Sequence, residues 1–317
     1  MVKKLKIVLL ASGNFGHRLL EHILHESEKF EIVSFITYVK LSNCSIIKTA
    51  QDHHINVLNL KTERKLDFVS ILKNLYSKVD YFIVIDFGKI IPLKFFNLYP
   101  YPLTKTINIH PSLLPLLRGA SPIQTTLLLE KKETAVTFIE MINELDAGPI
   151  IFQKKITILK DDDYDSLFEK IVSVTNENIY DVLIKLSTNQ IKPLKQESQK
   201  VSLTRLYYSK DFFLDFKQMA VDKIIAKIKA FSYRGCYFYF LKKKYLIYKA
   251  EVIKHPNNNK PGTLIKISNK QLLITCKNNS VDNLVLDVKQ IKAATRKSLP
   301  LLDFLNGFKL DKAQTVD

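Results

Sequence analysis

The sequence predicts an α/β protein in which a doubly wound, mostly parallel, Rossmann-like sheet is followed by a small β-barrel of the OB type. Two observations support this prediction. In the first half of the chain, short apolar segments alternate with helical segments, and strands separated by helices pair in parallel. In the last third, short apolar segments follow one another with only turns between them, a spacing that is typical of small barrels.

The N-terminal part is expected to be one α/β domain that spans residues 1–187. The expected strands are residues 6–10, 31–37, 55–58, 80–85, 106–109, 136–141 and 150–158. The expected helices are one that carries Leu19, Leu20, Ile23 and Leu24 on a single stripe, then residues 46–53, 68–76 and 165–187.

The C-terminal part is separated from the first domain by a polar stretch. Residues 188–205 contain Ser, Thr, Asn, Gln and Pro193 with little apolar periodicity, which predicts a linker. Residues 206–317 are expected to form the barrel. The expected elements are a helix at 221–231, strands at 237–241, 245–253, 262–267, 272–276 and 284–288, and a last helical turn at 300–304.

The composition is that of a globular protein. The 317 residues suit two domains, and 46% of them are hydrophobic, which argues against disorder. No apolar run approaches the ~20 residues that a membrane helix needs, so no membrane partner is expected. The apolar stretch at the start runs only from Ile7 to Ala11 and leads into a Ser-Gly-Asn-Phe-Gly turn, so we interpret it as a buried strand rather than a signal peptide.

The cysteines indicate a reducing compartment. Cys44, Cys236 and Cys276 are odd in number and far apart, which fits neither a disulfide framework nor a zinc site. We therefore expect a cytoplasmic protein without a bound metal, and we expect it to be a monomer.

Positive charge is concentrated in the last third of the chain. The formal net charge is +17. Residues 1–200 carry 26 Lys and Arg against 22 Asp and Glu, whereas residues 201–317 carry 22 against 9. A genome-wide lysine bias should act along the whole chain, so a basic module that binds a polyanion is the better explanation.

An apolar strand that ends in polar side chains is the first candidate site. Residues 108–122 read N-I-H-P-S-L-L-P-L-L-R-G-A-S-P. Asn108 and His110 are two residues apart, so both side chains point to one face of an extended strand. Pro111 and Pro115 prevent the strand from continuing. Open α/β sheets bind ligands outside the carboxyl ends of their strands, which makes this stretch a candidate active site.

A third polar group follows another strand of the same predicted sheet. Asp146 lies in the turn E-L-D-A-G-P, residues 144–149, after the expected strand 136–141. A single Asp in such a turn is more often a turn former, and a single His is more often structural. Three polar groups that each follow an apolar strand are expected to converge, so Asn108, His110 and Asp146 are the candidate catalytic residues.

Three sequence blocks together resemble the formyltransferases that use 10-formyltetrahydrofolate. The block N-I-H-P-S-L-L-P-x-x-R-G-A-x-P-I-Q, residues 108–124, is similar to the signature of that family. The block A-V-T-F-I-E-M-x-x-x-L-D-A-G-P-I, residues 135–150, is similar to its second block, and F-G-K-I-I-P, residues 87–92, to the loop on its folate side. A weaker similarity, to members that act on methionyl-tRNA, continues into the C-terminal third.

The resemblance implies formyl transfer from 10-formyltetrahydrofolate, a co-substrate, to an amine, with no metal and no covalent enzyme intermediate. Asn108, His110 and Asp146 match the family's catalytic trio. Such a transfer builds negative charge on the formyl oxygen and releases a proton from the attacking nitrogen. Asn108 and His110 would donate to that oxygen, His110 would also pass a proton to the departing folate nitrogen, and Asp146 would orient His110 and help to accept the ammonium proton.

The resemblance also implies which residues bind the folate. They are Ser112, Leu113, Leu114 and Pro115 of the S-L-L-P block, with Phe87, Gly88 and Ile90 of the earlier loop. Arg118 has two interpretations, contact with a substrate phosphate or shaping of its own loop, and we favour the second.

Two departures from the family concern the acceptor. Members that act on tRNA carry a long basic insertion after the second strand, whereas residues 38–48 here, Y-V-K-L-S-N-C-S-I-I-K, are shorter and hold only Lys40 and Lys48. The segment S-Y-R-G-C-Y, residues 232–237, stands where the family has a Trp-Pro-Gly-Ala pattern. These departures leave the identity of the acceptor open, but they do not affect the expectation of formyl transfer.

Three functions stay open at this point. Formylation of methionyl-initiator tRNA, bound through the basic C-terminal domain and the lysine-bearing linker, agrees with the charge distribution and is favoured. N-formylation of a nucleotide-linked amino sugar agrees with the shortened segment, but a single diphosphate does not need so much positive charge. A non-catalytic RNA-binding protein is disfavoured because the trio and the S-L-L-P block are intact.

Overall fold

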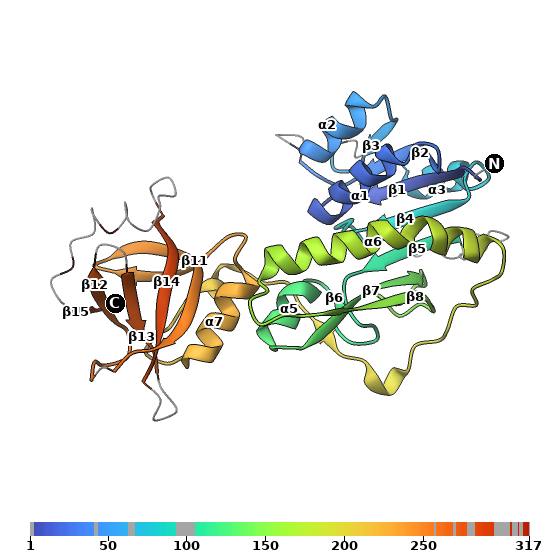
Figure 1. Cartoon of the computed structure of the whole chain (residues 1–317). Coiled ribbons are helices and arrows are strands. Elements are labelled where there is room, and N and C mark those ends of the chain that lie inside the picture. Colours follow the sequence, from blue (N-terminus) through green and yellow to red (C-terminus); the bar gives the residue numbers. More distant parts are fainter. Residues whose placement is uncertain are drawn as a thin grey trace. The chain divides into compact units, whose positions relative to one another are not determined.

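The computed structural model describes residues 3–40, 44–62, 67–92, 105–256, 258–268, 271–277, 283–294, 305, 310 and 313–316. It divides into two compact units (Figure 1). Unit 1 consists of Met1–Gly119, Glu133–Ile156 and Glu169–Leu203, and unit 2 consists of Ala120–Lys132, Thr157–Phe168 and Thr204–Asp317. The helical turn expected at 300–304 lies outside the described residues.

Unit 1 is built on a seven-stranded sheet with the order β3-β2-β1-β4-β5-β7-β8. Its strands are β1 (Leu5–Ala11), β2 (Phe30–Thr37), β3 (Val57–Asn59), β4 (Tyr81–Ile85), β5 (Thr106–His110), β7 (Glu133–Glu140) and β8 (Ile150–Thr157). The pairs from β3 to β5 are parallel, as predicted, whereas β5 and β7 pair antiparallel. The order reverses at β1, because β2 and β4 lie on opposite sides of it.

Helices cover both faces of this sheet, which is the doubly wound arrangement that the sequence predicts. The helices are α1 (Asn14–His25), α2 (Ser45–Asp52), α3 (Phe68–Tyr76) and α6 (Tyr164–Ser187). Phe68 and Leu72 of α3 pack in one buried cluster with Val8 and Phe82. On the other face, the hydroxyl of Tyr81 donates to the carbonyl oxygen of Leu183 in α6 at 3.0 Å.

Strand β5 is central in the sheet and carries the candidate site at its end. Ile107 and Ile109 are 0% and 2% exposed, and Thr106 is 1% exposed. The two isoleucines are buried as expected for a central strand, and Asn108 and His110 are its larger polar side chains.

Unit 2 contains a curled antiparallel sheet of six strands, with the order β10-β11-β14-β13-β12-β15 (Figure 1). These strands are β10 (Cys236–Phe240), β11 (Lys243–Lys254), β12 (Thr263–Ser268), β13 (Gln271–Thr275), β14 (Leu284–Ala293) and β15 (Ala313–Thr315). Helix α7 (Val221–Ala230) packs on α5 (Pro122–Leu128) and on β11. The sheet agrees with the predicted OB-like barrel.

Two further short strands, β6 (Arg118–Gly119) and β9 (Leu203–Thr204), pair with each other. Of the short 3-10 helices, η2 (Ser198–Lys200) lies within unit 1 and η3 (Ser209–Phe212) within unit 2. No helix within the described ranges is long and apolar enough to span a membrane.

Candidate active site

Asn108 and His110 project from the carboxyl end of β5. Asn108 is paired in register with Val84 of β4 on one side and with Ile139 of β7 on the other, so the strand is held along both edges. The two residues are separated by Ile109 and therefore share a face of the sheet. After His110 the chain leaves the sheet in a turn in which the Ser112 backbone N–H donates to the His110 carbonyl oxygen at 3.0 Å.

Asp146 reaches the same place by a route that the sequence did not predict. Because β7 is antiparallel to β5, its carboxyl end at Glu140 lies opposite Ile107, at the start of β5 rather than at its end. The following loop folds back, and the Glu140 N–H closes it by donating to the Pro149 carbonyl oxygen at 2.9 Å. Asp146 itself adopts a left-handed backbone with φ of 51°, which an Asp tolerates better than most residues.

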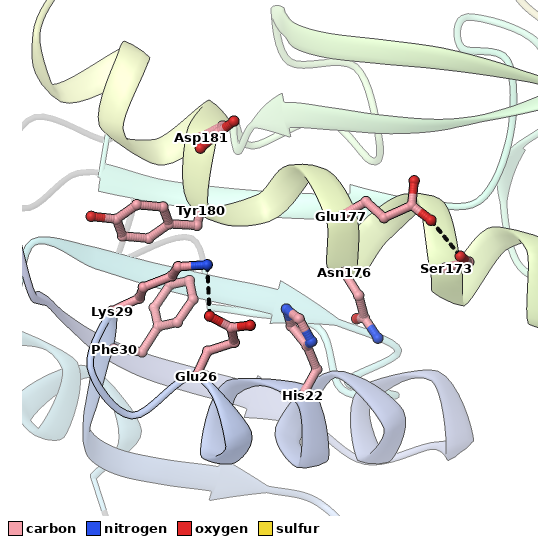
Figure 2. A pocket seen from close by; sticks show the side chains of 9 residues that line it. All are labelled: His22, Glu26, Lys29, Phe30, Ser173, Asn176, Glu177, Tyr180 and Asp181. Carbon is pink, nitrogen blue, oxygen red and sulfur yellow. Dashed lines mark hydrogen bonds and ion pairs between the residues drawn. The ribbon is translucent and has the colours of Figure 1, made fainter. Parts of the chain in front are cut away.

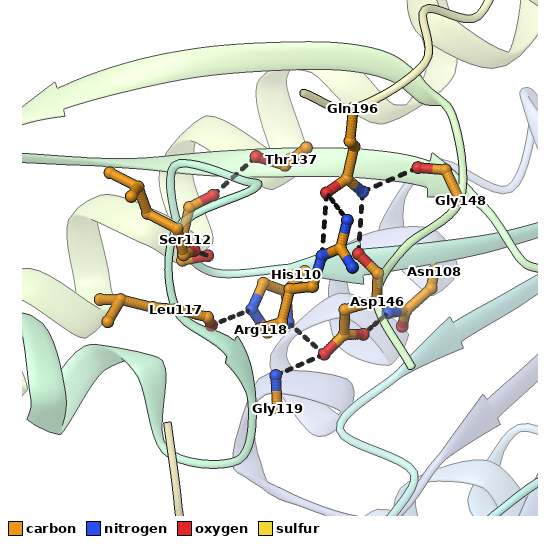
Figure 3. Close-up of polar contacts among 11 residues, drawn as sticks. Asn108, His110, Ser112, Leu117, Arg118, Gly119, Thr137, Asp146, Gly148 and Gln196 are labelled. Carbon is orange, nitrogen blue, oxygen red and sulfur yellow. Dashed lines mark hydrogen bonds and ion pairs between the residues drawn. The ribbon is translucent and has the colours of Figure 1, made fainter. Parts of the chain in front are cut away.

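The three predicted side chains lie together in one hydrogen-bonded cluster (Figure 3). The Asn108 amide donates from Nδ2 to Oδ1 of Asp146 at 3.0 Å. The backbone N–H of Gly119 donates to Oδ2 of Asp146 at 2.8 Å, and the same oxygen lies 3.6 Å from Nδ1 of His110. The His110 and Asp146 side chains are only 6% and 8% exposed. The carboxylate is therefore fixed by two donors and faces the imidazole.

Both ring nitrogens of His110 face acceptors. Nε2 lies 2.9 Å from the carbonyl oxygen of Leu117, and Nδ1 faces the carboxylate of Asp146. Nε2 is within hydrogen-bond distance of its acceptor, whereas Nδ1 lies beyond the length of a good hydrogen bond from the carboxylate. The carbonyl oxygen of Leu117 therefore fixes the orientation of the ring, and Nδ1 faces Asp146.

Arg118 and Gln196 support the loop that carries Asp146. Arg118 donates from Nε and Nη2 to Oε1 of Gln196 at 3.1 and 2.9 Å, and from Nη1 to Oε1 of Glu144 at 3.0 Å. Gln196 in turn donates from Nε2 to the carbonyl oxygens of Asp146 and Gly148, both at 2.8 Å (Figure 3). These contacts agree with the loop-shaping interpretation of Arg118.

Gln196 was missed by the sequence analysis. It lies within residues 188–205, a polar stretch without periodicity, and is nevertheless only 7% exposed. A neighbouring residue, Leu194, forms an isolated antiparallel bridge with Ile150, which holds the stretch against the sheet. Nothing in the local sequence marks a glutamine in such a stretch as buried.

The S-L-L-P block forms a tight turn next to the trio. Ser112 is fully buried and donates from its hydroxyl to the Leu116 carbonyl oxygen at 2.7 Å, while Leu114 is 2% exposed. Leu113 and Pro115 are partly exposed, and the Leu114-Pro115 peptide bond is cis. Of the block, Leu113 and Pro115 are therefore the residues that offer side-chain surface to a ligand.

The earlier loop of the predicted folate site is also partly open. Phe87 is 4% exposed and packs against Phe68 in the core, with ring centroids 6.0 Å apart. Gly88 is exposed with φ of 70°, and its missing Cβ would meet nothing within 4 Å. Ile90 is 89% exposed, an unusual position for a large apolar side chain.

Asp86, directly after β4, is a second residue that the sequence analysis missed. It lies beside the turn that follows β1, at the point where the strand order reverses and where such sheets bind ligands. The backbone N–H groups of Ser12 and Gly13 donate to its carbonyl oxygen, each at 3.1 Å. A Cβ on Gly13 would lie 1.6 Å from Oδ2 of Asp86, so this approach needs a glycine.

The carboxyl group of Asp86 has an elevated pKa. Although the residue is exposed to solvent, the surrounding protein removes much of the carboxylate's hydration, and this desolvation raises the pKa to about 6. A hydrogen bond from the backbone N–H of Phe15, in the first turn of α1, acts in the opposite direction and lowers the pKa.

A separate groove of about 450 Å³ lies between α1 and α6 (Figure 2). It is lined by His22, Glu26, Lys29, Phe30, Ser173, Asn176, Glu177, Tyr180 and Asp181. Glu26 forms an ion pair with Lys29 at 2.7 Å, and the hydroxyl of Ser173 donates to Glu177 at 2.6 Å. Burial lowers the pKa of His22, so its ring favours the neutral form. The groove shares no residue with the trio, and we assign it no function.

Two models of one protein family match most of the chain. The model described as formyl transferase matches residues 5–183, and the model described as formyl transferase, C-terminal domain, matches residues 208–309. The matches fall on the α/β part and on the barrel part in that order.

Two curated relatives match over more than nine-tenths of their length. The methionyl-tRNA formyltransferase of Caldanaerobacter subterraneus subsp. tengcongensis is 28% identical over 297 residues, which cover 90% of this chain and 92% of that protein. The methionyl-tRNA formyltransferase of Buchnera aphidicola subsp. Acyrthosiphon pisum is also 28% identical, over 99% of this chain and 100% of that protein.

Among solved structures, the sugar 3N-formyl transferase WlaRD, determined in the presence of dTDP and 5-N-formyl-THF, has a TM-score of 0.63. It is 20% identical, and the match covers 92% of this chain and 99% of that one. At this identity the likeness concerns the fold.

Proposed function

The chain belongs to the formyl transferase family, and we propose that it transfers a formyl group from 10-formyltetrahydrofolate to the amino group of methionyl-initiator tRNA. The curated relatives that it matches over more than nine-tenths of their length carry the name methionyl-tRNA formyltransferase. The observation that carries the proposal is the cluster of Asn108, His110 and Asp146, in which the His110 and Asp146 side chains are 6% and 8% exposed.

Formyl transfer requires donors at the formyl oxygen, because negative charge develops there as the amine attacks the carbon. Asn108 supplies one donor. Its Nδ2 carries two hydrogens, of which one is held by Asp146 at 3.0 Å, so the amide is oriented and a second hydrogen is left to donate. Because an amide does not titrate, this donor is present at every pH at which the fold is intact.

His110 supplies the second donor in the proposed reaction. Nε2 of its ring lies 2.9 Å from the Leu117 carbonyl oxygen, which orients the ring so that Nδ1 faces the carboxylate of Asp146. The 3.6 Å separation between Nδ1 and Oδ2 of Asp146 is longer than a good hydrogen bond, so the proton on Nδ1 is only weakly held. That proton is available for the formyl oxygen and then for the nitrogen that leaves with the folate.

Asp146 is the proton acceptor in this proposal. Attack by the amine produces a positively charged nitrogen that must lose a proton before the folate departs. Donors from Asn108 and Gly119 fix the carboxylate of Asp146, which faces the ring of His110. Only 8% of the side chain is exposed, so the transfer occurs away from bulk water.

The formyl donor is assigned to the surface formed by the S-L-L-P turn and the loop after β4. Leu113 and Pro115 are partly exposed on the first, and Gly88 and Ile90 are exposed on the second. Ser112, Leu114 and Phe87 are buried, so in this proposal they shape the backbone that faces the pterin. An exposed apolar side chain such as Ile90 suits a flat aromatic ring system.

The tRNA is assigned to the basic C-terminal part of the chain. Residues 201–317 hold 22 Lys and Arg against 9 Asp and Glu, which suits a long polyanion better than a single diphosphate. We therefore divide the chain into a catalytic domain (1–187), a lysine-bearing linker (188–205) and a tRNA-binding domain (206–317).

The test is to supply 10-formyltetrahydrofolate with either charged initiator tRNA or an amino-sugar nucleotide and to measure which amine becomes formylated. We expect product only on the methionyl-tRNA, and we expect its binding to weaken steeply as salt is added. Formylation of the amino sugar alone, with an affinity that hardly depends on salt, would identify the chain as a sugar formyltransferase instead.

A further inference from the structure

The hairpin of β10 and β11 in unit 2 presents two different faces. Cys236, Phe238 and Phe240 alternate along β10 and are 0% to 1% exposed, so they belong to the core of the unit. The intervening Tyr237 and Tyr239 point to the opposite face, where Tyr239 is 41% exposed. Their rings meet edge to face, with centroids 5.8 Å apart and an interplanar angle of 84°. The outer face of the hairpin is therefore aromatic.

Lysines border this aromatic face. Lys244 is the cross-strand partner of Tyr239, and its Nζ lies 3.9 Å from the centroid of the Tyr237 ring. Further along, Nζ of Lys292 in β14 lies 5.4 Å from the centroid of the Tyr248 ring. We call these five residues, Tyr237, Tyr239, Lys244, Tyr248 and Lys292, the tyrosine–lysine face.

Gly235 holds Tyr248 in this face. Its φ is 80°, a conformation that favours glycine, and a Cβ at this position would lie 3.0 Å from Cζ of the Tyr248 ring. The Tyr248 ring therefore packs directly on the backbone of Gly235.

The tip of the hairpin is a two-residue turn with an unusual sequence. Leu241 and Lys242 have φ of 49° and 59°, the backbone that a two-residue hairpin prefers but that Asn and Gly normally provide. Leu241 is 61% exposed, so the core does not explain why an apolar residue occupies this position. Lys242 and Lys243 flank it on the strand side. The tip is therefore an exposed apolar residue followed by two lysines, of which Lys243 is the cross-strand partner of the buried Phe240.

The charge of the hairpin limits the class of partner. Residues 236–250 contain four lysines and neither Asp nor Glu, and the one acidic residue of the hairpin, Glu251 in β11, pairs with Lys289 at 3.3 Å. A surface that combines an exposed aromatic ring with lysines matches single-stranded nucleic acid, in which phosphates pair with the cations and unpaired bases stack on the ring. In a duplex the bases are already stacked on one another, so few base faces are left for a tyrosine ring to contact.

We propose that the tyrosine–lysine face binds unpaired nucleotides of the acceptor tRNA by stacking them on Tyr239, the exposed ring of the face. The inference rests on the proposed function, because that function makes an RNA the substrate. It assigns to the β10–β11 hairpin a part of acceptor recognition that is separate from the catalytic cluster and from general phosphate contacts.

The test compares Tyr239→Ala with the matched variant Tyr239→Phe, which keeps the ring and loses only the hydroxyl. Affinities are measured for uncharged initiator tRNA, a short single-stranded RNA and a blunt RNA duplex. Tyr239→Ala should weaken binding of the first two by about 5- to 150-fold, the range for loss of one stacked base, and should leave the duplex unchanged. Tyr239→Phe should bind all three as the wild type does. Lys244→Gln should lower the salt slope by about one.

Two results would overturn the inference. The first is wild-type RNA affinity in Tyr239→Ala, including the case in which this variant instead loses binding to phosphatidylserine-containing vesicles. The second is an equal loss of RNA affinity in Tyr239→Phe and Tyr239→Ala. The formylation assay keeps this test apart from that of the proposed function. If the protein formylates methionyl-tRNA but Tyr239→Ala leaves its RNA affinity unchanged, only the proposed role of the tyrosine–lysine face is disproved. If RNA affinity depends on Tyr239 but no formylation is detected, only the proposed function is disproved.

Discussion

Oδ2 of Asp146 lies 3.6 Å from Nδ1 of His110, and neither side chain is more than a tenth exposed. Asp146→Asn tests this relationship. The variant keeps the shape and an acceptor oxygen, but it removes the carboxylate that faces His110 and that accepts the ammonium proton in the proposed mechanism. We expect kcat to fall by about 10²–10⁴-fold, the usual contribution of general acid–base catalysis. Single-turnover formylation of methionyl-tRNA measures the change.

The Asp146→Asn comparison needs a check on the fold, since Asp146 also accepts from Asn108 and Gly119. Circular dichroism and the melting temperature should stay close to those of the wild type. Turnover within a few-fold of the wild type, with the fold intact, would remove Asp146 from the mechanism.

Gln196 is expected to matter for turnover although it is not one of the trio. In Gln196→Ala the carbonyl oxygens of Asp146 and Gly148 lose a donor, and Nε and Nη2 of Arg118 lose their acceptor. Each buried group left unpaired costs about 1–3 kcal/mol. The loop that carries Asp146 should then shift, and a displacement of about 1 Å can reduce the rate by about 10²-fold. We expect both a lower melting temperature and a lower kcat.

The control for this prediction is Glu197→Ala, an exposed neighbour. A Gln196→Ala variant with the same kcat and melting temperature as Glu197→Ala would show that the hydrogen bonds of Gln196 do not position the loop.

The contrast between Asn108 and Gln196 shows what the sequence can predict. Strands β1 to β5 were predictable because each is a short apolar run bounded by turns, and Asn108 and His110 stand where such a run ends. Gln196 sits in a polar stretch, and its burial depends on Arg118, which is 78 residues away in the chain. Local periodicity carries no information about a contact of that kind.

Asp146 is an intermediate case. Its type and its turn were visible in the sequence, and it does lie with Asn108 and His110. The sequence suggested that both strands end at the same edge of the sheet. In the structure β7 runs antiparallel to β5, so the loop after β7 has to fold back to bring Asp146 to the carboxyl end of β5. The direction of a strand depends on its partners in the sheet, which a single apolar segment does not specify.

Gly148→Ala tests how tightly the returning loop is packed. A Cβ at Gly148 would lie 1.6 Å from the carbonyl oxygen of Glu140, and backbone atoms cannot swing aside as a long side chain can. We expect the loop to move, with a loss of stability of about 1–3 kcal/mol, as in other overpacked sites, and a lower kcat because Asp146 moves with it. Thermal unfolding and steady-state formylation measure the two effects.

Ala147→Gly, which removes atoms from the same loop instead of adding them, is the control for Gly148→Ala and should have the smaller effect on both quantities. A Gly148→Ala protein with wild-type stability and turnover would contradict the close approach between Gly148 and Glu140.

The last prediction concerns Asp86 and the dependence of stability on pH. Desolvation raises its pKa from 3.8 to about 6 in the folded protein, so between these values the folded state binds more protons than the unfolded state. The free energy of unfolding that Asp86 contributes must then fall as pH rises from about 4 to 6 and stay low above 6. Asp86→Asn cannot ionise, but it keeps an oxygen that can accept from the Phe15 N–H.

We therefore expect the melting temperature of Asp86→Asn, measured without substrates, to match the wild type near pH 4 and to exceed it near pH 8. The competing effect is the positive end of α1, which stabilises the ionised carboxylate through the Phe15 N–H. If that effect were the larger, the variant would instead become less stable than the wild type as pH rises. Asp161→Asn, a change at an exposed acid, should show no such trend, and a difference for Asp86→Asn that is constant with pH would rule out the raised pKa.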